Sequence, residues 1–309
     1  MNKIERVRAT LAGRAVDYPP FTLWYHMGTP FGSPELTARV HVEFFKAYDL
    51  DLLKVMNDYE YPMPPGLDCI VTPSDLAKVV PLDLDQTPMG KQLQAVKQIL
   101  REVNGEALVV ETVFDPWFTI RRFLLKEMMR PVMADYPDVL EAAIRVVNQN
   151  LIRYTRACLE MGVAGIFYAI AATAETVTRE QYERFMRPFH LEYFHAIGDK
   201  AECHILHAHG EKIYFDRLID YPVQVLSWAD LNGGPTIPEM RRHTDKTLMA
   251  GLDHAKFNFT SIPALREQVK TARALGGNTR FILAPGCTID TPTLAPYIRA
   301  TREAGRQPV

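Results

Sequence analysis

Short hydrophobic runs alternate along the chain with longer amphipathic stretches. The short runs are rich in β-branched and aromatic residues, and the longer stretches carry hydrophobic residues at the three-to-four-residue spacing of a helix. Eight runs are predicted as strands: 20–25, 51–56, 107–113, 164–169, 203–207, 223–228, 247–251 and 280–284. Helices are predicted at 2–12, 35–48, 90–103, 137–161, 179–199, 211–219, 236–243, 261–275 and 291–304. Strands that alternate with helices are typical of parallel strands joined by crossover helices, so we expect a (β/α)8 TIM barrel in one domain, residues 1–309.

Local signals refine this pattern in two places. Thr178 and Gln181 have the spacing of a capping box, and Ser261 with Pro263 suits a helix start. The segment 58–88 is rich in Pro and Asp and fits neither period. We expect it to form an inserted loop or small hairpin after the second strand, where further strands are possible.

Composition and charge exclude several classes of protein. Hydrophobic residues make up 47% of the chain and charged residues 23%, and no apolar run approaches the roughly 18 residues of a membrane span. Thirty-five Lys and Arg against 37 Asp and Glu leave no basic excess for a nucleic-acid partner. The 4 cysteines are too few for a disulfide scaffold, and the first residues lack the apolar core of a signal peptide. We therefore expect a cytoplasmic protein with reduced thiols.

Titratable and metal-competent residues gather at or just after the predicted strand ends. They are His26, Asn57, Asp58, Thr112, Asp115, Tyr168, His207, His209, Asp230, Asp253, His254 and Cys287. The strand starts are mostly apolar. In TIM barrels the catalytic groups lie at the carboxyl ends of the strands, so this asymmetry favours an enzyme, although polar residues mark any loop.

The sharpest local signal is the sequence Leu-His-Ala-His-Gly at 206–210. Side chains two apart on a strand point to the same face, so His207 and His209 are expected to converge at the barrel mouth. Neutral imidazole is a common zinc ligand, and a catalytic zinc usually has three protein ligands. Cys287, directly after the last strand, is the predicted third ligand, and Gly286 gives its loop freedom to lean across the mouth. Cys203 is the alternative third ligand. Without a metal, His207 and His209 would be an unrelated pair of loop histidines, and the cysteine would be a small buried hydrophobic residue.

Four further residues complete the candidate site. Asp58 and Tyr168 are the candidate catalytic residues: Asp58 follows the second strand, where a carboxylate could take a proton, hold a cationic group or support an Asn-Asp turn. The sequence defines no role for Tyr168. His26 and Asp253 are the candidate cofactor-binding residues, with helix capping as the competing explanation for Asp253. Nucleotide-binding, phosphate-binding and nucleophile-elbow glycine motifs are absent from the sequence, so nucleotide-dependent chemistry has no support.

Several motifs occur in an order and spacing that is more specific than any one of them. They are Leu11 to Pro20 (LAGRAVDYPP), Asp58, Phe114 to Phe118 (FDPWF), Val177 to Tyr182 (VTREQY), His207 to Gly210, Gly251 to Asp253 and Ala284 to Thr288 (APGCT). With these motifs the chain resembles the uroporphyrinogen decarboxylase superfamily over nearly its whole length. The resemblance implies a (β/α)8 barrel with its active site at the carboxyl ends of the strands.

Two activities compete within that superfamily. The true decarboxylases bind a tetrapyrrole through arginines in the loop after the first strand and carry a His where this chain has Cys287, yet residues 25–30 here contain no Arg. The other branch, the cobalamin-dependent zinc methyltransferases, holds zinc with a His-x-Cys pair and a distant Cys. By that resemblance His207, His209 and Cys287 would bind Zn²⁺, with His209 in place of the first Cys. The implied partners are a small methylated compound or thiol, cobalamin carried on a corrinoid protein, and a second copy of the chain as a homodimer.

Three functions remain open at this point. The first is a zinc-dependent methyltransferase, in which fewer thiolates make the metal a stronger Lewis acid and favour an O-methyl or N-methyl donor. The second is a cofactor-free decarboxylase acting on a substrate less anionic than uroporphyrinogen, with Asp58 stabilising the protonated intermediate. The third is a non-catalytic barrel that binds a corrinoid or tetrapyrrole. Aromatic residues near the predicted mouth, such as Trp24, Tyr25, Phe31 and Trp228, suit a flat or hydrophobic ligand but suit the core equally well.

Overall fold

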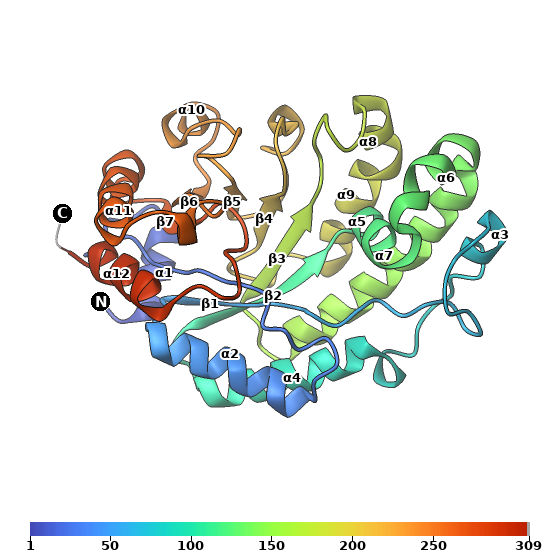
Figure 1. Cartoon of the computed structure of the whole chain (residues 1–309), viewed down its shortest axis with the longest axis horizontal. Coiled ribbons are helices and arrows are strands. Elements are labelled where there is room, and N and C mark those ends of the chain that lie inside the picture. The colour runs from blue at the N-terminus through green and yellow to red at the C-terminus, as the bar shows by residue number, and fades with distance from the viewer. Residues whose placement is uncertain (308–309) are drawn as a thin grey trace.

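Parallel strands curl into the wall of a barrel in the computed structural model, which describes residues 1–307 (Figure 1). Within those residues 7 strands pair in sequence order, each parallel to the next. They are β1 (Leu52–Val55), β2 (Leu108–Phe114), β3 (Gly165–Ile170), β4 (Ile205–Ala208), β5 (Val225–Trp228), β6 (Thr247–Leu252) and β7 (Phe281–Pro285). The structure therefore confirms an α/β fold with a curled parallel sheet, in the manner of a TIM barrel.

The eighth predicted strand, 20–25, is not confirmed as a regular strand. This segment lies between β7 and β1: the Thr22 N–H donates to the Leu283 carbonyl at 3.1 Å, and the Asp51 N–H donates to the Phe21 carbonyl at 2.9 Å. Only an isolated parallel bridge forms, between Phe21 and Leu283. Pro20 has no N–H, and the Phe21 N–H is taken by the Asp51 carboxylate at 2.9 Å, so a continuous ladder cannot develop.

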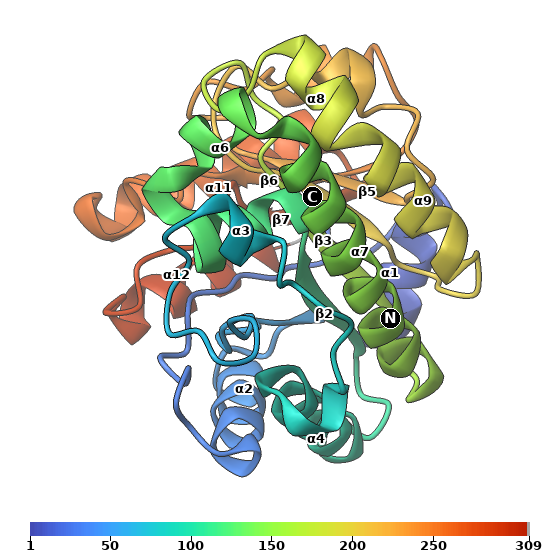
Figure 2. The same ribbon diagram turned by 90° about the vertical axis from the view of Figure 1, so that its right-hand side faces the viewer.

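Helices cover the outside of the sheet. They are α2 (Pro34–Tyr48), α4 (Pro88–Val103), α7 (Pro137–Glu160), α8 (Arg179–Phe185), α9 (Arg187–Ile197), α10 (Ile237–Arg241), α11 (Ile262–Gly276) and α12 (Ala295–Gly305). The first helix, α1 (Lys3–Leu11), instead packs its Val7 against the side chains inside the barrel. Three pairs pack side by side, namely α2 with α4, α7 with α9, and α11 with α12 (Figure 1 and Figure 2). Among residues 1–307, none of the helices combines the length and hydrophobicity needed to cross a membrane.

The helix starts follow the predicted caps. The Thr178 side chain accepts from the Gln181 N–H while the Gln181 side chain accepts from the Thr178 N–H, and Ser261 caps α11. The helix predicted at 179–199 is instead two helices, broken at Met186, because Pro188 has no N–H to continue the ladder. The helix predicted at 211–219 is reduced to one 3₁₀ turn, η4 (Phe215–Arg217).

The main helical segment that the sequence pattern did not predict follows β2. It consists of α5 (Pro116–Thr119), the π-helical turn η2 (Ile120–Leu125), η3 (Lys126–Met128) and α6 (Met129–Asp135). A π-helical turn is uncommon and frequently marks a functional site. The predicted insertion at 58–88 holds only α3 (Pro73–Leu76) and η1 (Leu84–Gln86), without a strand. Another 3₁₀ turn, η5 (Phe257–Phe259), follows β6.

Alternation along the strands divides the core into two layers. Inward side chains, among them Leu52, Met56, Phe167 and Ile205, fill the barrel, while their outward neighbours pack beneath the helices. On β1 this places Lys54 on the inward face, between Leu52 and Met56. A lysine therefore lies among the apolar side chains inside the barrel.

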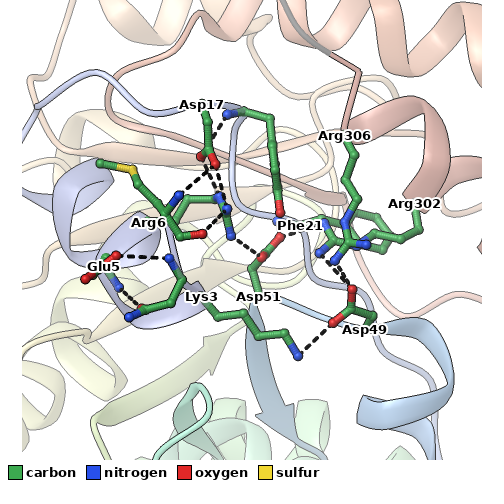
Figure 3. Close-up of polar contacts among 12 residues, drawn as sticks. Lys3, Glu5, Arg6, Asp17, Phe21, Asp49, Asp51, Arg302 and Arg306 are labelled. Atoms are coloured by element: carbon green, nitrogen blue, oxygen red, sulfur yellow. Dashed lines mark hydrogen bonds and ion pairs between the residues drawn. The ribbon is translucent and has the colours of Figure 1, made fainter.

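Ion pairs close the amino-terminal end of the barrel, opposite the end where the strands finish. The Asp51 carboxylate is fully buried and accepts from Arg6 Nη1 at 2.8 Å, from Arg302 Nη1 at 2.7 Å and from the Phe21 N–H (Figure 3). Arg6 also donates to Asp17 from Nε at 2.7 Å. Because Arg6 lies on α1 and Arg302 on α12, this network joins both ends of the chain to the start of β1.

Candidate metal centre

Two histidines and a cysteine meet at the carboxyl ends of the strands. One ligand atom from each of His207, His209 and Cys287 lies within 4.8 Å of the others, and Cys287 Sγ is 3.4 Å from His209 Nδ1. His207 lies on the inward face of β4, and His209 follows that strand with its N–H bonded to the Ile170 carbonyl of β3 at 2.8 Å. We call these three side chains the His-His-Cys cluster.

The loop after β7 carries Cys287 across the barrel mouth to β4. The Gly286 N–H donates to the Leu252 carbonyl at 3.0 Å, which anchors the loop to the end of β6. A Cβ on Gly286 would lie 2.5 Å from the Ala229 Cα, so only glycine allows the two backbones to pass this closely. Cys203, the alternative ligand, is fully buried deeper in the barrel and is not part of the cluster.

Neighbouring side chains orient the His207 ring. His207 Nδ1 is 3.1 Å from Ser227 Oγ on β5, which leaves Nε2 available on the other side of the ring. The ring stacks on Phe167, with 4.9 Å between centroids, and meets the edge of Trp24. A ligand histidine held in this way through its second nitrogen is typical of metal sites.

The electrostatics of the cluster favour a thiolate. Burial raises the pKa of the Cys287 thiol, but the hydrogen bonds and positive charge that His207 and His209 provide outweigh burial and leave the pKa well below its usual value. Burial lowers the pKa of His207, whereas the hydrogen bond with Cys287 raises the pKa of His209. A thiolate flanked by imidazoles is a donor set that a metal ion can bind by displacing the shared proton.

Lys54 lies in the same pocket, and the sequence pattern did not single it out. Its side chain faces into the barrel and its residue is only 2% exposed. Nζ lies 4.6 Å from the centroid of the Phe167 ring and 5.2 Å from that of Trp24. Burial lowers the pKa of Lys54 to about 7. The signal that could have revealed it is a charged residue at an inward position of an otherwise apolar strand.

The cluster and Lys54 line a small cavity of about 90 Å³. Its walls are aromatic, formed by Trp24, Phe114, Phe118 and Phe167, and His26 lies among the other lining residues. Phe118, Arg122 and His209 also line an adjoining open cavity of about 690 Å³, which further contains Arg121, Lys126 and Arg130. The small inner pocket thus adjoins a larger basic cavity formed mainly by the unpredicted segment after β2.

His26 and Asp58 form a pair beside this pocket. His26 Nδ1 lies 2.6 Å from Asp58 Oδ1, and Asp58 Oδ2 accepts from the Gly28 N–H at 3.0 Å. Burial raises the pKa of Asp58, but the hydrogen bond and charge of His26 outweigh it and lower the pKa. Both carboxylate oxygens therefore hold the loop after residues 20–25, and Asp58 reaches the pocket only through His26. Asp58 thus stabilises the loop at residues 26–28 and not an Asn-Asp turn of its own, and its catalytic role stays a prediction.

The remaining two predicted residues do not reach the cavity. Tyr168 faces outward on β3, where it is fully buried and stacks on Tyr193 with 4.5 Å between ring centroids. Its neighbours Phe167 and Ala169 occupy the inward face, so Tyr168 lies outside the cavity and its catalytic role stays a prediction without support from its position. Asp253 Oδ1 accepts from Asn232 Nδ2 and from the N–H groups of Ala255 and Lys256. These bonds stabilise the turn after β6 and do not cap a helix, because the next helical turn, η5, begins only at Phe257. The cofactor-binding role of Asp253 stays a prediction.

Comparisons with known proteins were made for the sequence and for the fold. The family model described as uroporphyrinogen decarboxylase (URO-D) matches residues 2–307. No curated protein matches the sequence significantly. Among solved structures, a methyltransferase from Methanosarcina mazei is similar with a TM-score of 0.78 and 17% identity, over 99% of this chain and 98% of the other. A B12-independent methionine synthase from a Shewanella species has a TM-score of 0.51 and 14% identity, over 69% of this chain and 65% of the other. At these identities the two structures support the fold alone.

Proposed function

The chain belongs to the uroporphyrinogen decarboxylase family, and from its His-His-Cys cluster we propose that it is a zinc-dependent methyltransferase. The proposed reaction moves a methyl group between a small methylated compound or thiol and a corrinoid protein. The observation that carries this proposal is the convergence of His207, His209 and Cys287 in a pocket. The Methanosarcina mazei structure, which covers nearly the whole chain, is itself a methyltransferase and adds support.

The three side chains fit a zinc ion by type, number and spacing. Zinc accepts imidazole nitrogen and thiolate sulfur, and catalytic sites commonly use three protein ligands with one position left for water or substrate. Donor atoms within 4.8 Å of one another are close enough to bind one ion. The cluster also lines the cavity, so a metal ion that these residues held would be accessible to a substrate in the pocket.

Each residue of the site has a defined task in this proposal. Cys287, His207 and His209 would hold the metal, and Ser227 keeps the His207 ring in the orientation that presents Nε2. A zinc ion bound there supplies Lewis acidity, which polarises a methyl donor or lowers the pKa of a substrate thiol. The aromatic walls from Trp24, Phe114 and Phe167 limit the access of water to that position.

The adjoining cavity supports the second half of the proposal. With a volume of about 690 Å³ it is open and borders His209, so it gives a large cofactor on another protein a route to the cluster. The cationic side chains Arg121, Arg122, Lys126 and Arg130 line it. A corrinoid protein that docks at this face would bring its methyl-accepting cobalt toward the inner pocket.

Metal analysis of purified variants tests the proposal. We expect the intact protein to hold about one zinc ion per chain, and His207→Ala and Cys287→Ala to reduce that content strongly. Cys69→Ala, which removes an exposed cysteine outside the cluster, is the control and should retain the zinc. With cobalt(II) in place of zinc, metal still bound by His207→Ala should keep the thiolate charge-transfer band, whereas metal still bound by Cys287→Ala should lack it. Zinc-free intact protein, or zinc content unchanged in both cluster variants, would overturn the proposal; release of CO2 from acids by metal-free protein would support the decarboxylase alternative.

A further inference from the structure

Lys54 is a buried amine that has no carboxylate partner within hydrogen-bond distance among residues 1–307. Within residues 1–307 the only hydrogen bond of its Nζ is to the thioether sulfur of Met56, at 3.4 Å, which is a weak acceptor. The remaining contacts are the faces of Phe167 and Trp24. A buried ammonium ordinarily has a carboxylate or several oxygen acceptors, because leaving it unpaired costs several kcal/mol by general estimates. The side chain is therefore poised for a partner that enters from the cavity it lines.

The nearby negative groups are already engaged elsewhere. Asp58 is bound by His26 and the Gly28 N–H. Glu111 lies on the opposite face of β2, where Gln92 and Tyr154 donate to it, and burial raises its pKa to about 8, so it is mainly neutral at neutral pH. Cys287 is bound by the imidazoles. Within the part of the chain that the structure describes, no carboxylate is therefore left to pair with Lys54.

A second cation faces the same cavity. Arg122, in the π-helical turn η2, lines the inner pocket and rests on the rings of Phe114 and Phe123. Among the described residues it has no ion pair, and its charge lowers the pKa of Lys54, as expected of a like charge nearby. Two basic side chains and one thiolate therefore surround the small cavity, and with both basic groups protonated the potential at the position where a ligand binds is positive.

We propose that Lys54, with Arg122, is the anion-binding subsite of the pocket, and that the substrate is a small organic acid whose carboxylate or similar anionic group lies against Lys54. This inference rests on the proposed function, since it places the methyl-bearing end of the same molecule at the His-His-Cys cluster. Lys54 is then the residue that determines the preference for an anionic substrate. Protonated methylamines and quaternary ammonium compounds are excluded as substrates, because their positive charge would lie among cations without compensation.

The size and walls of the pocket narrow the substrate further. A cavity of about 90 Å³ admits only a small fragment, and the aromatic rings on its sides favour an apolar or flat body between the acid and the reacting atom. A larger acid would have to extend past Arg122 into the adjoining cavity. The two cations thus lie at the inner end and at the exit of one binding path.

Binding of three methyl ethers of nearly equal size tests the subsite. Methoxyacetate is an anion, methoxyethanol is neutral and methoxyethylamine is a cation, and their affinities for the intact chain can be measured by calorimetry with and without zinc. We expect the acid to bind about tenfold or more tightly than the alcohol, as a charge-assisted hydrogen bond provides, and the amine to bind least. Lys54→Met, which keeps the length of the side chain without its charge, should abolish the preference for the acid.

Two further variants keep the test decisive. Arg122 lies at an exposed position, so Arg122→Gln should leave the fold intact. It should lower the affinity for methoxyacetate by a smaller factor than Lys54→Met does. Lys97→Met removes an exposed lysine on α4 and should change nothing. Equal binding of acid and alcohol by the intact chain, no saturable binding of the acid, or an acid preference that survives in Lys54→Met would overturn the inference. Zinc content tests the proposed function separately. A protein that prefers the acid but holds no zinc would support the anion-binding subsite and overturn the zinc-dependent methyl transfer.

Discussion

Cys287 Sγ lies 3.4 Å from His209 Nδ1, although the two residues are 78 positions apart and β5 and β6 separate their strands in the sheet. The contact exists because the sheet curls, so that the ends of β4 and β7 face each other across the mouth. The loop after β7 is guided there by Gly286 and by its bond to the end of β6. The candidate site therefore depends on barrel curvature as much as on the identity of its side chains.

Ser227 is expected to influence metal binding without touching the metal. Its hydroxyl holds His207 Nδ1 at 3.1 Å, so Ser227→Ala should free the ring and reduce zinc affinity by about 10–100-fold. Competition with a chromophoric chelator measures the change. Ser74→Ala, at an exposed position, is the matched control. Unchanged zinc affinity in Ser227→Ala would mean that packing against Phe167 alone orients the ring.

Gly286 is expected to tolerate no side chain. A Cβ would lie 2.5 Å from the Ala229 Cα, so Gly286→Ala should displace the loop and lower the free energy of unfolding by about 1–3 kcal/mol. Zinc retention should fall as well, because Cys287 is the next residue. Gly32→Ala is the control, since its Cβ would come no closer than 3.3 Å to its neighbours, which are the side chains of Leu36 and Thr29. Urea unfolding and metal analysis report the two effects, and an equal response of both variants would contradict this account.

The sequence pattern located all three residues of the cluster but did not show which residues of the other strands face inward. His207 and His209 were found because two imidazoles at period two converge whatever the details of the barrel. The same alternation puts Tyr168 on the face of β3 opposite to Phe167 and Ala169. Which of the two faces points inward depends on how β3 packs against α9. A strand that is buried on both faces does not show this in its sequence. Lys54 was not predicted for a related reason: the strand 51–56 was read as an apolar run, without asking which face its one lysine occupies. The segment 116–135 lacks a regular helical period because its first turns are of mixed type.

Asp51 is expected to contribute strongly to stability and not to the site. Its buried carboxylate lies between Arg6 and Arg302 at the end of the barrel remote from the cluster (Figure 3). Asp51→Asn removes the buried charge that both guanidinium groups share and leaves them only the more exposed Asp17 and Asp49, so the free energy of unfolding should fall by about 3–5 kcal/mol. Urea denaturation checks this, with Asp68→Asn at an exposed position as the control. The folded fraction of Asp51→Asn should still bind zinc, and a loss of zinc by folded protein would show that the two ends of the barrel are coupled.

Glu111 is expected to make stability depend on pH. Burial raises its pKa from the usual 4.5 to about 8, against hydrogen bonds from Tyr154 and Gln92 that act in the opposite direction. The folded protein therefore binds a proton that the unfolded chain releases above pH 4.5, and this stabilisation is lost as the pH rises toward 8. Between about pH 6 and pH 8 the loss should amount to about 2 kcal/mol.

Glu111→Gln isolates this contribution, because glutamine resembles the protonated acid and keeps an oxygen that can accept from Tyr154. The variant should lose the decline in stability between neutral and mildly alkaline pH, and at the alkaline end it should be at least as stable as the intact protein. Parallel urea unfolding curves across that pH range give the comparison, with Glu106→Gln, an exposed position just before β2, as the control. Because Glu111 lies on the opposite face of β2 from Thr112, which lines the inner pocket, zinc affinity should not follow the same profile. Identical pH profiles for Glu111→Gln and the intact protein would show that the carboxyl is already ionised in the folded state and that another group, with Lys54 the nearest cation, compensates its charge.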